Sequence, residues 1–343
     1  PRPLAARTFC PIMKFRSAFL GLLHALLALS ATPAIAQSSA TMRAFGGAPY
    51  GLTARQLAVV INQNDPASVE AGAYYVKARG VPAENVIRVH LPHGAAKLAR
   101  EQFETLRATL DAQAPAAVQA LLLVWTTPYA VECNAITAAL TLGLDEALCS
   151  RTCAPSRPSP YYDSASLRPR DDLSLRISML LPADDIAMAR ALIDRGVAAD
   201  RRMPRGTAYL VKTADANRNT RAAFYPRDAA LRKPPLRIRN LESEALDAAD
   251  DVMFYLTGRA WVDNLDTLRF LPGALADHLT SSGGDLLGKH QMSSLRWLDA
   301  GATASYGTVS EPCNHWQKFP NPAVLIKHYA LGASAIEAYW KSV

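Results

Sequence analysis

The side chains best suited to chemistry lie in the last third of the chain. Asp277 and His278 are adjacent, and Glu311 lies two residues before Cys313. A histidine oriented by a carboxylate can act as a general base, and a reduced cysteine near a base can act as a nucleophile. If the chain is an enzyme, these residues predict a hydrolase in which His278 works with Asp277, Glu311 or Cys313.

Each of these residues also has a structural interpretation. A histidine can stabilise a loop by bonding a carbonyl group, and Glu311 can cap a loop. Cys313 cannot act as a nucleophile if it forms a disulfide, for example with Cys133. The catalytic and the structural interpretations both stay open at this point.

Other residues are candidates for ligand contact. Trp261 and Trp316 could stack on a sugar ring, although aromatic side chains more often pack in a core. Gly283 and Gly284 would allow the backbone to approach a ligand closely. The segment 218–239 holds seven basic residues and one acid. It could meet an anionic glycan or lipid head groups, although a solvated loop is the simpler interpretation.

An alternation of strands and helices must position these residues. Short apolar runs typical of buried strands occur at 57–61, 86–91, 120–125, 175–181, 207–212, 252–256 and 302–309. Amphipathic or capped segments predict helices at 66–79, 100–111, 184–197, 241–249, 321–330 and 334–342. The segment 275–280 fits either the end of a strand or a short helix. The sequence therefore predicts an α/β fold with a largely parallel sheet and helices on both faces.

The pattern divides the chain into two α/β halves, at 50–132 and 173–343. A cysteine- and proline-rich insertion, at 133–172, separates them. In an open parallel sheet, the loops at the carboxyl ends of the strands line the ligand crevice. The segments that hold His278 and Glu311 follow predicted strands, so we expect them to converge.

The first 36 residues indicate an export signal. Met13 is followed by Lys14 and Arg16, then by an apolar run at 18–31 and an Ala-Ile-Ala cleavage motif at 34–36. We expect translation to begin at Met13, and the protein to reach the periplasm or the cell exterior. An uncleaved anchor is the alternative. No later apolar run reaches 18 residues, so we do not expect an integral membrane protein after cleavage.

Export changes both the charge and the cysteine count. The formal net charge of the 343 residues is +7, and the four basic groups of residues 1–36 bring it to +3. This charge does not favour nucleic-acid binding. Cys10 also leaves, and the remaining four cysteines predict two disulfides of open connectivity. They are Cys133, Cys149, Cys153 and Cys313.

Motifs for common cofactors are missing from the sequence. It contains no glycine-rich nucleotide-binding motif, no zinc-protease motif and no G-x-S-x-G nucleophile motif. The spacing of Cys149 and Cys153 could suggest a metal, but no histidine lies near them. We therefore predict no cofactor and no metal.

Several segments together resemble an uncharacterised family of exported bacterial proteins, found in genomes that carry exosortase and PEP-CTERM sorting. The segments are LAVVINQNDPASVEAGAYYVKARGVPAENV, PYAVECNAIT, the cysteine pair with SPYY, LPGALADHLTSSGG, QMSSLRWLDAGATASYGTVSEPCN and KFPNPAVLIKHYALGASAIEAYWKSV. The resemblance covers about residues 50–343. It implies a role near surface-protein sorting or exopolysaccharide production, with cell-surface proteins or exopolysaccharide as partners. Family members continue past this C-terminus, so we expect the chain to be truncated there.

A weaker similarity is to the caspase-like fold of gingipain-type cysteine peptidases, which also have an R-G turn like Arg79-Gly80. That similarity places the catalytic histidine in FYLTG, where Thr257 precedes Gly258, and the catalytic cysteine near LPGALADH, which has none. It implies a two-part caspase-like fold without the catalytic pair. Three functions stay open: a non-catalytic accessory factor, a secreted hydrolase, and a glycan-binding module.

Overall fold

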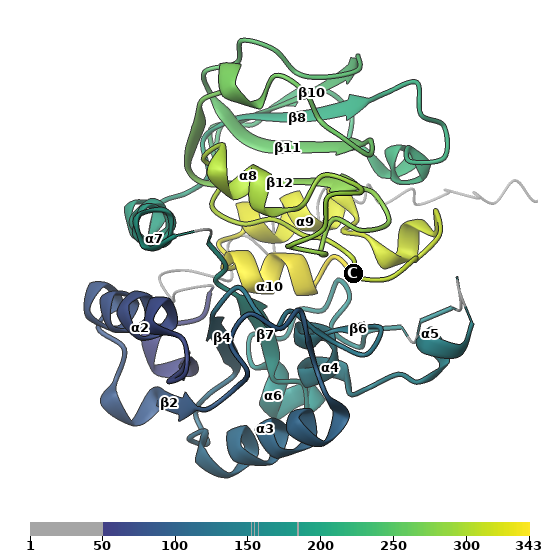
Figure 1. Cartoon of the computed structure of the whole chain (residues 1–343). Helices are drawn as coiled ribbons and strands as arrows, with labels where there is room; N and C mark the ends of the chain where they lie inside the picture. Colours follow the sequence, from purple (N-terminus) through teal and green to yellow (C-terminus); the bar gives the residue numbers. More distant parts are fainter. Residues whose placement is uncertain (1–50, 152, 154, 157, 184) are drawn as a thin grey trace, which may run out of the picture. The chain divides into compact units, whose positions relative to one another are not determined.

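The fold is α/β, as the sequence predicts, and its strands form two mainly parallel sheets (Figure 1). The computed structural model describes residues 51–343 except 152, 154, 157 and 184. The predicted export signal lies outside these residues. In the part of the chain that is described, no helix has the length and apolarity needed to cross a membrane.

The first sheet has four parallel strands in the order β2-β1-β4-β7. They are β1 (Leu57–Asn62), β2 (Val86–Val89), β4 (Ala120–Val124) and β7 (Ile177–Leu180). Every residue of β4 is buried, as is every residue of β1 except Leu57. Such strands need apolar side chains on both faces, which explains their continuous apolar sequence.

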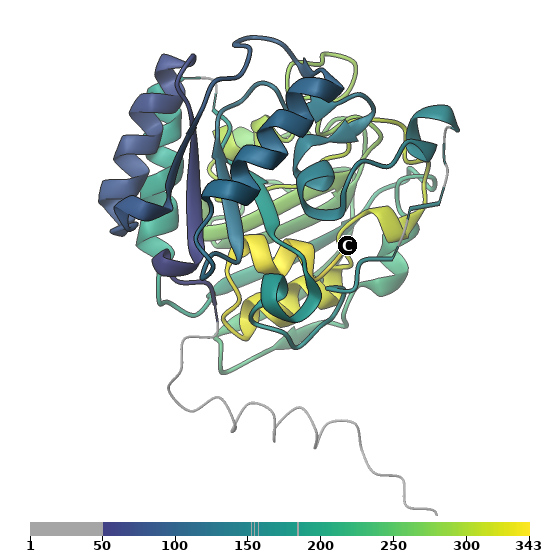
Figure 2. The same ribbon diagram turned by 90° about the horizontal axis from the view of Figure 1, so that it is seen from below.

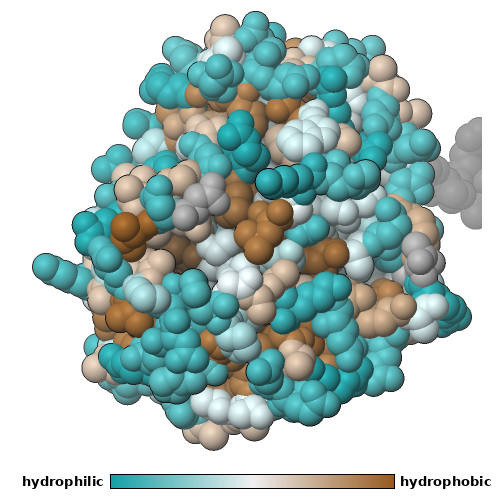
Figure 3. Space-filling model, in the orientation of Figure 1, coloured by the Kyte–Doolittle hydropathy of each residue, from teal (hydrophilic) through white to brown (hydrophobic). Residues whose placement is uncertain are grey.

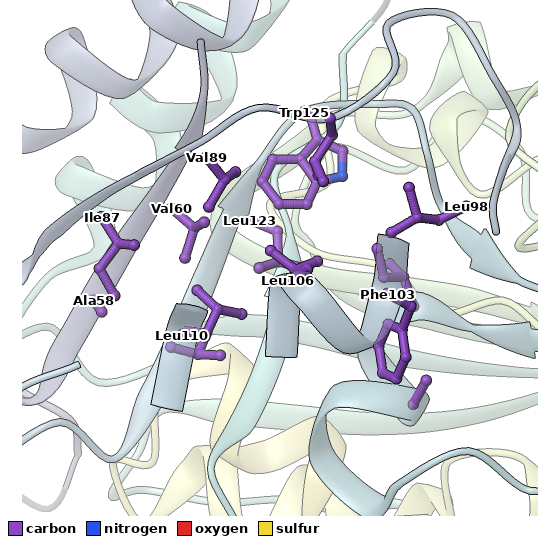
Figure 4. Close-up of a cluster of buried hydrophobic side chains, with 14 of the residues drawn as sticks. Ala58, Val60, Ile87, Val89, Leu98, Phe103, Leu106, Leu110, Leu123 and Trp125 are labelled. Atoms are coloured by element: carbon purple, nitrogen blue, oxygen red, sulfur yellow. The ribbon is translucent and has the colours of Figure 1, made fainter. Parts of the chain in front are cut away.

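Helices cover both faces of the first sheet. On one face, α3 (Arg100–Gln113) and α4 (Ile136–Leu142) contribute apolar side chains to a core with β1, β2 and β4 (Figure 4). On the other face, α2 (Pro66–Arg79) and α7 (Ile186–Ala199) lie side by side (Figure 2). Local signals define α2, because Asp65 caps it and Gly80 ends it with a φ of 60°.

The second sheet has the order β12-β11-β8-β10-β9. Its strands are β8 (Gly206–Lys212), β9 (Ala229–Ala230), β10 (Leu236–Glu242), β11 (Val252–Gly258) and β12 (Phe270–Leu279), of which only β9 is antiparallel. The predicted helix at 241–249 is wrong, because Leu241 and Glu242 belong to β10 and residues 243–249 form bends and loop. The ambiguous segment 275–280 belongs mostly to β12. The strand predicted at 302–309 is reduced to one isolated bridge, between Leu275 and Ala304.

The last two helices lie between the two sheets (Figure 1). α9 (Pro322–Ala330) and α10 (Ala335–Trp340) pack on one face of the second sheet, and α8 (Leu295–Asp299) packs on the other. α10 also reaches the first sheet, where the Trp340 indole donates a hydrogen bond of 2.8 Å to the Ser178 carbonyl. The C-terminal segment therefore contributes to the packing of both sheets.

Short elements complete the fold. They are β3 (Lys97–Leu98), β5 (Ala130–Val131), β6 (Asn134–Ala135), α5 (Ala147–Ser150), α6 (Pro169–Leu173) and five 3-10 turns (Ala54–Gln56, Ala83–Asn85, Thr220–Phe224, Leu265–Thr267 and Trp316–Lys318). β3, β5 and β6 form a small third sheet. The face seen in Figure 3 is mainly hydrophilic, and its apolar side chains lie in small separate groups.

Candidate functional site

Strands β11 and β12 hold the positions that the caspase-like similarity assigns to a catalytic pair. They are parallel neighbours, so that Thr257 pairs with His278 and Gly258 with Leu279. That similarity predicts a histidine where Thr257 stands, and β12 contains no thiol. The carboxyl edge of the second sheet is therefore the candidate site.

The segment that follows β8 closes this edge. The Thr213 hydroxyl donates a hydrogen bond of 2.7 Å to the Gly258 carbonyl. The Arg218 backbone packs so tightly here that a Cβ atom on Gly258 would lie 1.9 Å from the Arg218 carbonyl oxygen. Thr257 is 1% exposed. A substrate cannot reach Thr257 or Gly258 in this conformation.

A buried ion pair lies within the same edge. Arg221 Nη1 is 2.5 Å from Asp277 Oδ1, and each side chain is 1% exposed. The guanidinium also donates to the carbonyl groups of Thr257 at 2.8 Å and Asp277 at 3.2 Å. Burial raises the pKa of the Asp277 carboxyl, and the Arg221 guanidinium opposes this rise. Arg221 thus links β11 and β12 to the closing segment.

His278 is held from both ring nitrogens. The Trp297 indole donates a hydrogen bond of 2.9 Å to Nδ1. An indole can only donate, so the imidazole proton lies on Nε2, which donates to the Met292 carbonyl at 3.0 Å. Burial, assisted by the Arg221 guanidinium, lowers the pKa of His278 to about 3. The imidazole is therefore neutral near pH 7, with no nitrogen free to take a proton.

Asp277 does not orient His278, although the two are adjacent in sequence. Successive side chains of a strand point to opposite faces of the sheet, and both residues lie in β12. Asp277 contacts Arg221 on one face, and His278 contacts Trp297 on the other. The predicted catalytic role of these two residues has no support from this geometry and stays a prediction.

The four cysteines of the described chain form two pairs. Cys133 is joined to Cys149, and Cys153 to Cys313, with Cα atoms 5.3 and 5.2 Å apart. The suggested pairing of Cys313 with Cys133 is therefore not the one formed. As a disulfide, Cys313 has no thiolate to act as a nucleophile. Glu311 caps the same loop, because its Oε1 accepts a 2.7 Å hydrogen bond from the Cys313 amide.

The four ligand-contact candidates differ in exposure, and Gly283 and Gly284 are buried. Trp261 is 49% exposed, whereas the Trp316 ring packs against Phe224, with centroids 4.3 Å apart. A Cβ atom on Gly284 would lie 2.5 Å from the Gly307 carbonyl oxygen. Gly284 therefore makes room for another part of the backbone. A Cβ atom on Gly283 would make only ordinary contacts, the nearest at 3.5 Å.

Two other groups at these edges escaped the sequence analysis. Tyr129 follows β4 and Asp285 follows β12. The Tyr129 hydroxyl donates a hydrogen bond to the Asp285 carboxylate. Burial and this carboxylate raise the pKa of Tyr129. The bond brings the carboxyl edges of the two sheets together. No local signal could have indicated it, because 156 residues separate its partners.

A second network surrounds the turn after β12. Thr280 donates a 2.7 Å hydrogen bond to Gln291, and the Ser282 amide donates to the same oxygen at 2.8 Å. Arg218 donates to the Thr280 hydroxyl at 3.3 Å. The neighbouring Ser281 is half-buried. Among the described residues, neither the Ser281 nor the Ser282 hydroxyl is shown to bond another side chain.

Neither a metal site nor a known relative helps to define an activity. Within residues 51–343, apart from the four undescribed positions, no group of three or more His, Cys, Asp or Glu side chains could hold a metal ion. Comparison of the chain with family models, with curated proteins and with solved structures found no match.

Proposed function

We propose that this chain is an exported accessory factor that acts by binding. It has a caspase-like fold whose catalytic edge is closed, and it serves surface-protein sorting or exopolysaccharide production. The packing of Arg218 against Gly258 carries the first part of this proposal, because it covers the catalytic position. The second part rests on the resemblance of the sequence segments.

Three further observations support binding over catalysis. His278 is neutral, with both nitrogens engaged. Asp277 is paired with Arg221 in the core. Cys313 is part of a disulfide. A general base must have a nitrogen or oxygen within reach of the proton that it abstracts, and Asp277 and His278 are each only 1% exposed.

The disulfides support the exported location. Disulfides persist in oxidising compartments such as the periplasm and the cell exterior, and they are rare in the cytosol. Both pairs, Cys133–Cys149 and Cys153–Cys313, involve the insertion at 133–172. They cross-link the insertion within itself and to the last third of the chain.

A deletion strain with complementation tests the proposal. Deleting the gene should lower the yield of sorted surface proteins or of exopolysaccharide, and the wild-type gene should restore it. Glu311→Gln and Ser281→Ala should restore it equally well, because a binding factor does not need these groups as acid, base or nucleophile. Purified processed protein should not hydrolyse a peptide or ester library. Turnover that Glu311→Gln or Ser281→Ala abolishes would establish the hydrolase instead.

A glycan-binding function keeps one supporting observation, the exposed Trp261 ring. Exposed aromatic rings commonly stack on sugars. Titration of soluble exopolysaccharide into the processed protein should then quench tryptophan fluorescence, and Trp261→Ala should abolish the change. Trp316→Ala is the matched control, since Trp316 packs against Phe224. Quenching that survives Trp261→Ala would exclude this site.

A further inference from the structure

Two loops meet at the amino edge of the second sheet. The first, at 201–205, connects α7 to β8, and the second, at 231–235, is the turn between β9 and β10. Gly206 at the start of β8 pairs with Leu236 at the start of β10. The Gly206 amide also donates a 3.2 Å hydrogen bond to the Pro235 carbonyl. The two loops, here called the amino-edge surface, are therefore neighbours.

The amino-edge surface is strongly basic. It contains five basic residues, all exposed, and no acid: Arg201, Arg202, Arg205, Arg232 and Lys233. The acids nearest in sequence are engaged elsewhere. Asp200 is paired with Arg79 at 2.6 Å, and Asp228 accepts hydrogen bonds from Asn240. Just before the neighbouring strand β11, Asp251 accepts hydrogen bonds from Thr207 and Tyr209.

Each loop also exposes one large apolar side chain among its basic residues. Met203 is 53% exposed and Leu231 is 40% exposed. The prolines Pro204 and Pro234, one in each loop, are buried. Proline restricts the backbone, so the loops are held in place while their apolar and basic side chains stay in solvent. Solvated apolar side chains are unfavourable, and two such residues in adjacent loops suggest a surface that becomes covered.

We propose that the amino-edge surface docks on a bilayer that contains anionic phospholipids. Basic side chains attract the negatively charged head groups, and apolar side chains such as those of Met203 and Leu231 enter the boundary between head groups and acyl chains. A soluble polyanion would satisfy the charges but would leave both apolar side chains in water. The combination of the two chemistries favours a membrane surface.

This inference goes beyond the proposed function and does not depend on it. An exported protein that docks on a membrane would work next to proteins that are being sorted there. A hydrolase or a glycan-binding module with the same surface would be localised in the same way. Failure of the docking test would therefore leave the binding proposal intact, and the reverse also holds.

The test measures vesicle binding by the processed protein recovered from the periplasm of an expression host. Co-sedimentation with vesicles that contain 30% phosphatidylglycerol should be clear, whereas vesicles of pure phosphatidylcholine should bind little. Each basic residue near an anionic surface contributes about 5-fold, so Arg232→Ser with Lys233→Ser should weaken binding about 25-fold. Met203→Ser with Leu231→Ser should weaken it roughly 10-fold. Binding should also decrease with salt.

Two matched double variants in other parts of the chain provide the controls. Arg88→Ser with Lys97→Ser removes two exposed charges, and Val69→Ser with Leu142→Ser removes two side chains that are 40% and 37% exposed. Neither should change binding more than 2-fold, and thermal unfolding should show that all variants fold. The proposal is overturned if anionic vesicles do not bind, or if the controls act as strongly. It is also overturned if the protein binds soluble polygalacturonate as tightly as it binds anionic vesicles, and if Met203→Ser with Leu231→Ser does not weaken vesicle binding.

Discussion

The two sheets share one strand order but bury different chemistry. In each, the second parallel strand of the chain lies on one side of the first, and the third and fourth lie on the other. The first sheet buries mainly apolar side chains, and its strands bury the polar side chains of Asn62 and Ser178. The second sheet buries Thr257, Asp277, His278 and the guanidinium of Arg221.

The difference follows from how each sheet is covered. The connections of the first sheet contain α2, α3 and α4, which cover it locally. Residues 206–279, all of them described, contain no α-helix. The second sheet is covered instead by the later helices α8, α9 and α10, and by the closing segment with Arg221. Its stability therefore depends on long-range contacts, whereas the first sheet depends more on neighbouring segments.

The largest expected effect concerns the disulfides. Cys153–Cys313 spans 160 residues and links the insertion to the second half, whereas Cys133–Cys149 spans 16. In the chain-entropy account, replacing both cysteines of the longer pair by serine costs about 5 kcal/mol, and doing so for the shorter pair about 3 kcal/mol. Urea unfolding measures both. Free thiols in the folded, unreduced protein that lacks residues 1–36 would contradict the pairing.

The buried ion pair should show the next largest effect. Arg221→Met leaves the Asp277 carboxylate unpaired in the core and should cost about 3–5 kcal/mol. Arg221→Met with Asp277→Leu should recover most of this loss, because no buried charge remains. Urea unfolding measures both variants. Arg100→Met is the control on the first half, since it breaks the half-exposed pair with Glu132 and should change stability little. A small effect of Arg221→Met would show that the pair is not needed.

The stability of the second half should decrease in acid because of His278. Its pKa is about 3 in the folded protein and about 6.5 when unfolded, so only the unfolded chain gains this proton between these values. Above pH 6.5 both states are neutral at this site and it contributes no pH dependence. From pH 6.5 to 4.5 the free energy of unfolding should fall by about 2 kcal/mol.

His278→Asn isolates this contribution. The variant should be less stable than the wild-type protein near pH 7. On acidification its free energy of unfolding should fall less steeply with pH, and the difference in slope should correspond to about one proton. His328 contributes to the slope that remains in the variant, because burial also lowers the pKa of His328. Equal slopes in the two proteins, measured by urea unfolding at several pH values, would mean that His278 titrates freely in the folded state.

The smallest effect distinguishes two neighbouring glycines. Gly284→Ala forces a Cβ atom against the Gly307 backbone and should cost roughly 2 kcal/mol. Gly283→Ala should be tolerated, because its Cβ atom meets nothing nearer than 3.5 Å. Thermal unfolding compares the two variants. Equal tolerance would show that the turn after β12 can move away from Gly307, and that the closed edge is looser than the packing indicates.

Much of the fold was predictable, because its signals are local. The strands at 57–61, 120–125 and 252–256 are continuous apolar runs, and the strands found there are buried on both faces. The helix from Pro66 to Arg79 has its cap and its terminating glycine in place. The strand β10 was not predicted, since its arginines and neighbouring prolines indicate a loop. Pairing with β8 satisfies its backbone and overrides that preference.

The site was less predictable. Asp277 and His278 seemed to form one unit because they are adjacent, but in a strand adjacent side chains face opposite ways. Arg221 belonged to a basic segment that looked solvated. Its burial depends on Asp277, 56 residues later, so no local pattern indicates it.

The sequence by itself determined the α/β class and the positions of most strands and helices. Only the tertiary structure decided which cysteines join, that Arg218 closes the edge at Gly258, and that Arg201–Arg205 lies beside Leu231–Lys233. The physical reason is one of range. Hydrophobic period, caps and turns act over a few residues, whereas pairing and burial depend on segments that only the folded chain brings together.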